Sequence, residues 1–339
     1  MLMLLRDCLL EDVLITPKHS ICNQVHDHYL PKLIHHNENG DDKEEKEIAV
    51  RNLLFNTDGT GLAWYTNARN DFEATVEGTR PALFKTIVPP LADMNFRSIC
   101  SNTSTRALFA HIRATSGSTV VAVNNHPFVF GRHSFMHNGS VSSFTAIRRA
   151  ICDELDLDVY ANILGSTDSE HVAALYIHYL TEGRGKAAWE EEYSTREMAS
   201  AIHKAVAFVI AAQTKILGND RRPNSLNLAT TDGRRLVTLR FRNSVTEQPP
   251  SLYYSTTAGV TLNRKYPDHP NADTGRSYGE ASMKPEDHSA HVIVSSEPTT
   301  YKTEDWELIE KNSFLVMDID GKAVTEKIKY EDGWDAEDS

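Results

Sequence analysis

The order of the secondary-structure signals along the chain constrains its fold more than any other feature of the sequence. Short aromatic or β-branched runs, bounded by Gly, Pro or Asn, predict a first set of strands at 61–65, 82–88, 107–114, 126–130 and 133–136. Apolar residues at helical spacing then predict helices at 142–155, 166–180 and roughly 197–213. A second set of strands is predicted between 225 and 330. Because strands and helices come in blocks without regular alternation, the pattern predicts a layered α+β fold with antiparallel sheets and argues against a Rossmann sheet.

The domain organisation follows from length and local composition. The 339 residues show no internal repeat and no sign of two separate cores, so one domain is predicted over residues 1–330. The polar, turn-rich stretch at 263–289 is predicted to be a long exposed loop or an insertion. The acidic stretches at 41–47 and 331–339 are predicted to be solvated, the second as a tail after the domain.

Charge and cysteine content narrow the classes of partner and compartment. The formal net charge of −12 argues against nucleic acid and against an anionic membrane surface. No run of about 18 apolar residues marks a transmembrane span, and the first residues lack the basic start and cleavage site of a signal peptide. The four cysteines are scattered without a C-x-x-C pair, which predicts free thiols in a reducing compartment, the cytoplasm.

Two motifs in the first set of strands can serve either structure or ligand binding. Residues 56–65, NTDGTGLAWY, form a Gly-containing turn that leads into a strand, and a plain hairpin turn accounts for them on spacing alone. Arg113, in HIRATSGS (111–118), lies near the end of a strand beside small hydroxyl residues. A guanidinium there can bind a carboxylate through two parallel N–H···O bonds, and a surface ion pair is the alternative.

Two further motifs flank the first predicted helix. In His137-Asn138-Gly139, the Asn138 amide and the Gly139 N–H would form an oxyanion hole, in which the loss of one donor costs roughly 3–4 kcal/mol of transition-state stabilisation. A plain turn is the alternative. Asp168, in GSTDSEH (165–171), stands at a predicted helix start, where Thr167 and Glu170 have capping-box spacing. There a carboxylate can complement the helix dipole or bind a substrate ammonium group.

Taken together, these groups suit one class of ligand. Arg113 for a carboxylate, Asp168 for an ammonium, and Asn138 with Gly139 for a carbonyl oxygen match an α-amino acid with a side-chain amide. Glutamine, or another γ-glutamyl compound, meets that description.

The same segments resemble the class II (Ntn-type) glutamine amidotransferases, in particular the branch that contains the fungal glutathione-degradation amidotransferase subunit and its bacterial relatives. The matching stretches cover nearly the whole chain: DGTGLAWY (58–65), FAHIRATS (109–116), NNHPF (124–128), FMHNGSVSSF (135–144), GSTDSEH (165–171), 230–242, 249–255 and 292–317.

This resemblance implies a fold and a set of residue roles. The expected fold is a four-layer αββα sandwich, in which two antiparallel sheets lie between helical layers. The expected roles are the substrate α-carboxylate for Arg113, the α-ammonium for Asp168, the oxyanion hole for Asn138 and Gly139, and the wall of the glutamyl pocket for Thr115. The resemblance also implies a small γ-glutamyl substrate, no cofactor, no metal and, for the glutathione-degrading branch, a metallopeptidase-like partner subunit.

The chain departs from the family at the nucleophile. In the family, removal of Met exposes an N-terminal cysteine whose own α-amino group acts as the general base. Here the second residue is Leu2, and Cys8 has no terminal amine beside it. Three explanations stay open: a wrong start codon or a lost first exon, a true variant with a disabled site, or processing just upstream of Cys8. The chain as written is expected not to hydrolyse glutamine.

The sequence leaves three functions open. The first is hydrolysis of γ-glutamyl amides, glutamine or glutathione, by thiolate attack and a thioester intermediate. The second is a non-catalytic γ-glutamyl-binding or scaffold subunit of a glutathione-degrading complex. The third, metal-dependent hydrolysis, is suggested by 15 histidines with clusters at 26–28 and 35–36. None of these has zinc-site spacing, so solvated surface histidines are the expected interpretation.

Overall fold

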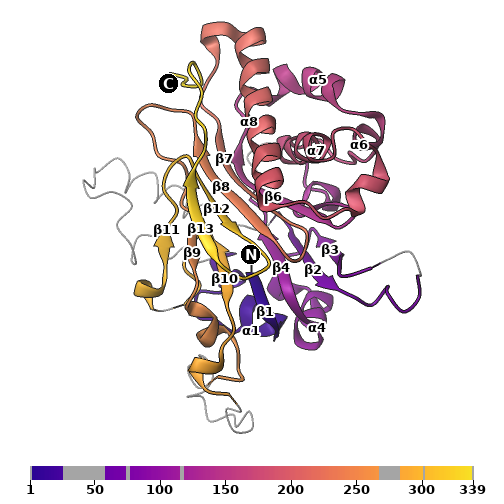
Figure 1. Cartoon of the computed structure of the whole chain (residues 1–339), viewed down its shortest axis with the longest axis vertical. Coiled ribbons are helices and arrows are strands. Elements are labelled where there is room, and N and C mark those ends of the chain that lie inside the picture. The colour runs from indigo at the N-terminus through magenta and orange to yellow at the C-terminus, as the bar shows by residue number, and fades with distance from the viewer. Residues whose placement is uncertain are drawn as a thin grey trace. The chain divides into compact units, whose positions relative to one another are not determined.

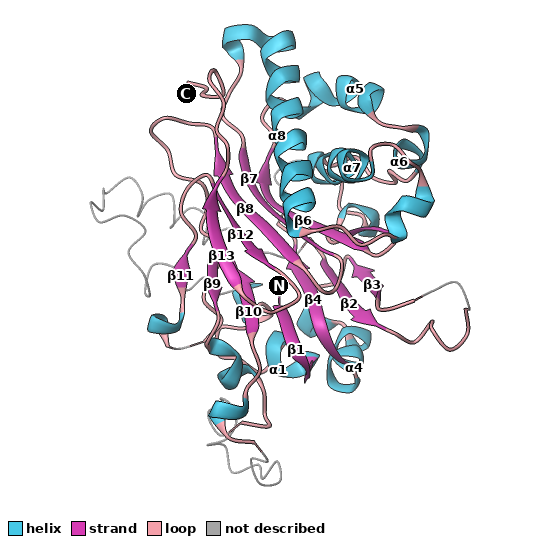
Figure 2. Ribbon diagram, in the orientation of Figure 1, coloured by secondary structure: helices cyan, strands magenta, loops and turns pink. Residues whose placement is uncertain are grey.

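The structure, a computed structural model, describes residues 2–25, 58–73, 77–114, 118–266, 283–300 and 302–337. They group into two compact units, each assembled from segments far apart in the chain. The first unit comprises Met1–Tyr65, Leu83–His126 and Ser251–Leu308, and the second comprises Thr66–Ala82, Pro127–Pro250 and Ile309–Ser339. Figure 1 shows the chain by residue number and Figure 2 by secondary structure. The single domain expected over residues 1–330 stays a prediction.

A seven-stranded sheet belongs mainly to the first unit, with the strand order β11-β9-β10-β1-β4-β2-β3. The pairs β1–β10, β1–β4, β2–β4, β9–β10 and β9–β11 are antiparallel. The strands are β1 Leu2–Leu9, β2 Thr60–Thr66, β3 Arg80–Thr86, β4 Ser104–Ile112, β9 Tyr253–Ser255, β10 His291–Ser295 and β11 Glu307–Leu308.

Two α-helices of the first unit, α1 (Leu10–Leu14) and α4 (Met94–Asn102), pack against each other and against β1. Helix α4 is capped by Asp93, the residue before it, whose carboxylate accepts hydrogen bonds from the N–H groups of Asn95 at 2.8 Å and Phe96 at 3.2 Å. This is the usual way in which an N-cap satisfies the first free donors of a helix. Short 3₁₀ turns also occur here: Asn23–Val25, Pro90–Ala92, Ala122–Asn124, Ala258–Leu262, Pro285–Asp287 and Thr303–Asp305.

A six-stranded antiparallel sheet belongs to the second unit, with the strand order β13-β12-β8-β7-β6-β5. The strands are β5 Phe128–Phe130, β6 His133–Ser140, β7 Ser225–Thr231, β8 Leu236–Arg242, β12 Ser313–Met317 and β13 Ala323–Lys327. The helices are α5 Phe144–Glu154, α6 Leu157–Ala161, α7 Asp168–Thr181 and α8 Thr195–Leu217, with 3₁₀ turns at Lys186–Glu190 and Gly218–Asp220.

Helix α8 supplies much of the core of the second unit. The helical stretch Thr195–Asp220 is, among the described residues, the one long and apolar enough to cross a membrane by length and composition. Its buried side chains, however, join a hydrophobic cluster with residues of α5, α7, β7 and β8, and α8 lies beside α5 and α7 (Figure 1). Such burial is expected of a core helix, and it confirms the helix predicted near 197–213.

Two segments predicted to be exposed are partly buried. Trp334, in the predicted acidic tail, is only 5% exposed and packs edge-on against Phe241 with ring centroids 5.8 Å apart. The Arg221 guanidinium donates to the carbonyls of Gly333 at 2.7 Å and Trp334 at 3.0 Å. The solvated tail is therefore wrong at Trp334, whose indole ring packs on the second unit, while Asp332, Asp335 and Glu337 are exposed as predicted.

The start of the predicted loop at 263–289 is also ordered against the first unit. Asn263 and Tyr266 are buried, and Arg264 donates from its backbone N–H and its guanidinium to the buried Asp12 carboxylate at 2.9 and 2.6 Å. The prediction of an exposed loop is therefore wrong at this end, where the half-buried Arg264 and the buried Asp12 form an ion pair that holds the chain. Residues 267–282 and the acidic stretch 41–47 lie outside the described residues.

Candidate functional site

The Asn138-Gly139 pair lies at the end of β6, where the plain-turn interpretation is wrong. Both residues are strand residues paired with β7, Asn138 opposite Asn227 and Gly139 opposite Leu226. Gly139 has φ +146°, and a Cβ atom on it would lie 1.9 Å from the Ser225 carbonyl oxygen. Only glycine fits this position. Both Asn138 and Gly139 are exposed, as residues that donate to a ligand oxygen must be.

Asp168 begins α7 and is tied to the segment that follows Gly139. One carboxylate oxygen, Oδ2, accepts from the Val141 N–H at 2.8 Å, and the other, Oδ1, accepts from the Ser169 N–H at 2.8 Å. Capping of the helix is done by Thr167, whose hydroxyl accepts from the Glu170 N–H at 3.2 Å. The Asp168 carboxylate therefore bonds both within its helix and to the segment after β6, which brings Asn138, Gly139 and Asp168 together in the second unit.

The start of α7 is held by further polar contacts. The Glu170 carboxylate accepts from the N–H groups of Leu164 at 2.9 Å and Gly165 at 2.7 Å, so only one half of the predicted capping box forms. His171 Nδ1 donates to the Thr167 carbonyl at 2.7 Å, and His171 Nε2 accepts from Arg148 Nε at 3.2 Å. Burial lowers the pKa of His171, which agrees with this neutral tautomer. These contacts fix the first turn of α7, which carries Asp168.

His137 is a functional candidate that sequence reasoning missed. Its imidazole is buried, with Nδ1 2.9 Å from the Ser169 hydroxyl and Nε2 3.3 Å from the Ser225 carbonyl oxygen. Burial lowers the pKa of His137, so the ring is neutral near pH 7. No local sequence signal links His137 to Ser169, which lies 32 residues later. The two side chains meet because α7 packs against β6.

Arg113 follows β4 in the first unit. Its backbone continues the ladder, with the Arg113 N–H donating to the Gly59 carbonyl at 2.9 Å and the Asp58 N–H donating to the Arg113 carbonyl at 3.0 Å. The guanidinium donates to the Thr119 carbonyl at 3.1 Å and to the Ser118 hydroxyl. Because Arg113 is only 4% exposed, the surface ion pair is wrong. Thr115 lies outside the described residues.

Cys8 is not a reactive substitute for the family nucleophile. It lies in β1 opposite Thr105, is 3% exposed, and belongs to the hydrophobic cluster of the first unit with Leu62 and Phe96. Burial raises the pKa of the Cys8 thiol, with the charge of Asp12 acting in the same direction. A thiol protonated at neutral pH is a poor nucleophile, so Cys8 within the intact β1 strand does not replace the family nucleophile. Processing upstream of Cys8 stays a prediction.

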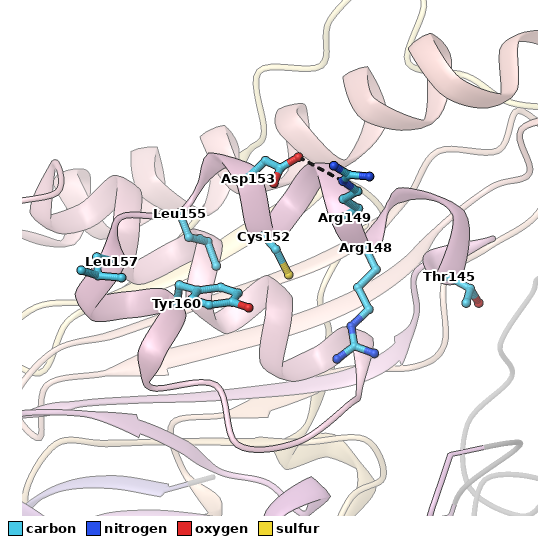
Figure 3. Close-up of a pocket in the computed structure, with 8 residues that line it drawn as sticks. All are labelled: Thr145, Arg148, Arg149, Cys152, Asp153, Leu155, Leu157 and Tyr160. Atoms are coloured by element: carbon cyan, nitrogen blue, oxygen red, sulfur yellow. Dashed lines mark ion pairs between the residues drawn. The ribbon is translucent and has the colours of Figure 1, made fainter.

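The described residues contain no group of three His, Cys, Asp or Glu side chains arranged to hold a metal ion. The histidine clusters at 26–28 and 35–36 lie outside them. An open hollow of about 720 Å³ is formed on α5 and α6 (Figure 3), and none of its lining residues is a predicted site residue: Thr145, Arg148, Arg149, Cys152, Asp153, Leu155, Leu157 and Tyr160. The candidate site is therefore the end of β6 with the start of α7.

Comparison with known proteins agrees with this fold. Residues 51–247 match the family described as glutamine amidotransferases class-II. The chain is 30% identical over 314 residues to the probable glutamine amidotransferase DUG3 of Saccharomyces cerevisiae, a match that covers 91% of this chain and 78% of that protein. The chain belongs to the class II glutamine amidotransferases.

A solved structure supports the fold. The glutamine aminotransferase class-II domain protein from Silicibacter pomeroyi superposes with a TM-score of 0.54 at 22% identity, covering 79% of this chain and 90% of that one. The predicted α+β class, with antiparallel sheets and helices in the Ntn-type family fold, is confirmed.

Proposed function

We propose that the chain binds γ-glutamyl compounds, with the ligand ammonium on Asp168 and the amide carbonyl oxygen at Asn138 and Gly139. The observation that carries this proposal is the hydrogen bond at 2.8 Å from the Val141 N–H to Asp168 Oδ2, because it joins the end of β6 to the carboxylate. Asp168 is half-buried and each of its oxygens has a second lone pair. The roles of Arg113 and Thr115 toward the same ligand rest on the family resemblance alone.

Hydrolysis of such a ligand requires a thiolate. The sulfur attacks the γ-carbonyl carbon, the oxygen becomes an oxyanion held by the Asn138 amide and the Gly139 N–H, and the amine leaves with a proton. Water then cleaves the thioester and releases glutamate. Because the Cys8 thiol is buried and a protonated thiol is a poor nucleophile, we propose that the chain of this sequence binds the ligand without cleaving it.

Glutamine and glutathione share the γ-glutamyl head, so Asp168, Asn138 and Gly139 serve both. The resemblance to the glutathione-degrading branch favours glutathione, with Cys-Gly as the leaving group and a metallopeptidase-like subunit as partner. The described cysteines are free, which supports a cytoplasmic location. Glutathione as the substrate, a metallopeptidase-like partner and a cytoplasmic location are therefore proposals that extend the proposed binding of γ-glutamyl compounds.

The second candidate is a non-catalytic γ-glutamyl-binding or scaffold subunit of a glutathione-degrading complex. The burial of Cys8 favours it, because no other feature of β1 offers a nucleophile. A version of the chain that begins with a processed cysteine separates the two functions: a trapped acyl-thioester with glutamine or glutathione supports the hydrolase, and no trapped adduct supports the scaffold.

Calorimetric titration of the purified chain with L-glutamine and with glutathione tests the binding itself. We expect binding of at least one ligand, no release of glutamate from glutamine, and an affinity loss of about 30-fold in Asp168→Asn, since a charged partner of the ammonium is removed. Ser313→Ala, a buried serine of β12, serves as the control that keeps its affinity. Glutamate release at an ordinary amidotransferase rate would contradict the proposal that the chain binds its ligand without cleaving it.

A further inference from the structure

We propose that His137 and Ser169 form a positioning pair that orients the Asp168 carboxylate toward the ammonium group of the ligand. This inference rests on the proposed function, because it assigns to two buried residues a role in the same γ-glutamyl site. Neither residue is placed in contact with the ligand. Each acts through Asp168 or through the strand that precedes it.

The hydrogen bonds of the pair fix its protonation pattern. The Ser225 carbonyl can only accept, so His137 Nε2 carries the proton and donates to it at 3.3 Å. His137 Nδ1 is then an acceptor, and it takes the Ser169 hydroxyl proton at 2.9 Å. The pKa of His137, lowered by burial, agrees with a neutral ring. His137 is 2% and Ser169 6% exposed, so water competes little for these bonds.

Ser169 connects this pair to the carboxylate. Its backbone N–H donates to Asp168 Oδ1 at 2.8 Å, and its hydroxyl oxygen lies 3.3 Å from the same atom. The hydroxyl has one proton, and the shorter distance assigns it to His137. Asp168 Oδ1 therefore keeps an unused lone pair on the side of Ser169, and the full negative charge is available to a cation.

The other end of the imidazole is anchored where β6 approaches β7 most closely. The Ser225 carbonyl that accepts from His137 is the same group that would collide with a Cβ on Gly139. The position of a Gly139 Cβ would also lie 3.1 Å from His137 Nε2. The His137 ring thus contacts both the backbone against which Gly139 packs and Ser169, the residue after Asp168. Loss of the ring would therefore change the position of Asp168 relative to the strand that carries Asn138 and Gly139.

The test compares two ligands that differ only in the ammonium group. L-glutamine carries it, and glutaramate has the same γ-amide and carboxylate without the α-amino group. The hydroxyl bond to His137 holds Ser169, and with it the backbone N–H that donates to Asp168. Ser169→Ala removes that hold and is expected to weaken L-glutamine binding about tenfold and glutaramate binding less than about twofold. Ser169→Thr keeps the hydroxyl and is expected to restore L-glutamine affinity to within about threefold.

A second pair of variants tests the imidazole itself. His137→Asn places an amide oxygen near the position of Nδ1 and keeps an acceptor for Ser169, whereas His137→Gln reaches only the position of Nε2. We expect the Asn variant to retain more L-glutamine affinity than the Gln variant by about fivefold. Thermal melts of each variant verify folding, and Ser313→Ala again serves as the matched control.

The outcomes separate the positioning role from the proposed function. Equal losses for L-glutamine and glutaramate in Ser169→Ala, or no loss for either, overturn the positioning role while wild-type binding and the Asp168→Asn loss stand. If the wild-type chain binds neither ligand, or Asp168→Asn binds L-glutamine as well as wild type does, the proposed function fails and the positioning role fails with it. A selective loss for L-glutamine that Ser169→Thr restores supports the pair.

Discussion

Strand β6 of the second unit and strand β1 of the first unit differ in what they present to solvent. Strand β6 ends in the exposed residues Asn138 and Gly139, while the imidazole of His137 on the same strand is buried and hydrogen bonded. Strand β1 carries Cys8, whose thiol is enclosed by apolar side chains. The proposed ligand-binding residues of β6 are therefore open to solvent, whereas the one cysteine of β1 is shielded from it.

Ligand binding and nucleophilic attack have different physical requirements. Binding an ammonium, the role proposed for Asp168, needs a carboxylate that is held in place and partly exposed. Two backbone N–H groups hold the Asp168 carboxylate, and the residue is half-buried. A nucleophilic cysteine needs a lowered pKa and access to the substrate. Burial moves the pKa of Cys8 in the opposite direction.

The largest effect is expected from Gly139→Ala, which changes β6 at the point where it pairs with β7. The new Cβ would meet the Ser225 carbonyl oxygen at 1.9 Å with the backbone at φ +146°. We expect a loss of about 3–5 kcal/mol in the free energy of unfolding and no measurable L-glutamine binding. Urea unfolding followed by circular dichroism provides the first measurement and calorimetry the second.

Gly218→Ala is the matched control for that substitution. Gly218 has φ +57° at the end of α8, and a Cβ on it would meet no atom within 4 Å. The cost is therefore backbone strain alone, about 1 kcal/mol, with ligand affinity unchanged. Equal costs at Gly139 and Gly218 would contradict the close approach of β6 to β7.

An intermediate effect is expected from pH on the β1 side. His291, opposite Leu4 of β1, accepts the Gly259 N–H at Nε2 at 2.8 Å, and burial, aided by His288, lowers its pKa to about 4. The unfolded residue titrates near 6.5, so the unfolded state binds more protons between these values and stability falls as pH decreases. His291 should contribute a loss of about 2 kcal/mol between pH 7 and pH 5.

His291→Gln checks this contribution, because its amide oxygen can still accept the Gly259 N–H but does not titrate. Urea unfolding at both pH values should show a shallower loss in the variant. Part of the pH dependence is expected to remain in the variant, because burial also lowers the pKa of His133, at the start of β6, to about 4. A variant with the full wild-type pH dependence would show that His291 is not the titrating group.

The smallest effect is expected from Cys8→Ala. Removal of one buried sulfur costs about 1 kcal/mol of unfolding free energy, and the affinity for L-glutamine should not change. Thermal melts and calorimetry measure the two quantities. Lost ligand binding in a folded Cys8→Ala variant would show that β1 takes part in the site, against the contrast with β6.

Much of the fold could be predicted because its signals are local. Alternating aromatic and β-branched residues marked the strands that became β2, β4, β5 and β6, and Thr167 marked the start of α7. The predicted strand at 133–136 ended too early, since Asn138 and Gly139 favour turns in isolation. Seven consecutive register pairs with β7 outweigh that preference, because ladder hydrogen bonds and packing override local propensity.

The missed features depend on contacts between distant segments. Helix α4 has a mixed surface and is fixed by the Asp93 cap and by packing on β1 and α1. The role of His137 depends on Ser169 and Ser225, which no spacing rule connects to it. Motif residues such as Arg113 and Asp168 could be named from the sequence, but their hydrogen-bond partners could not.

The docked C-terminal segment has a practical consequence for work with this protein. Composition places the end of the domain at residue 330, yet a chain cut there would lose Trp334 and leave the Phe241 ring without its edge-on neighbour. It would also leave the Arg221 guanidinium without the carbonyls of Gly333, Trp334 and Asp335, to which it donates hydrogen bonds. Such a truncation would expose apolar aromatic surface and favour aggregation. A C-terminal boundary for expression should therefore lie after Trp334, even though the residues around it are acidic.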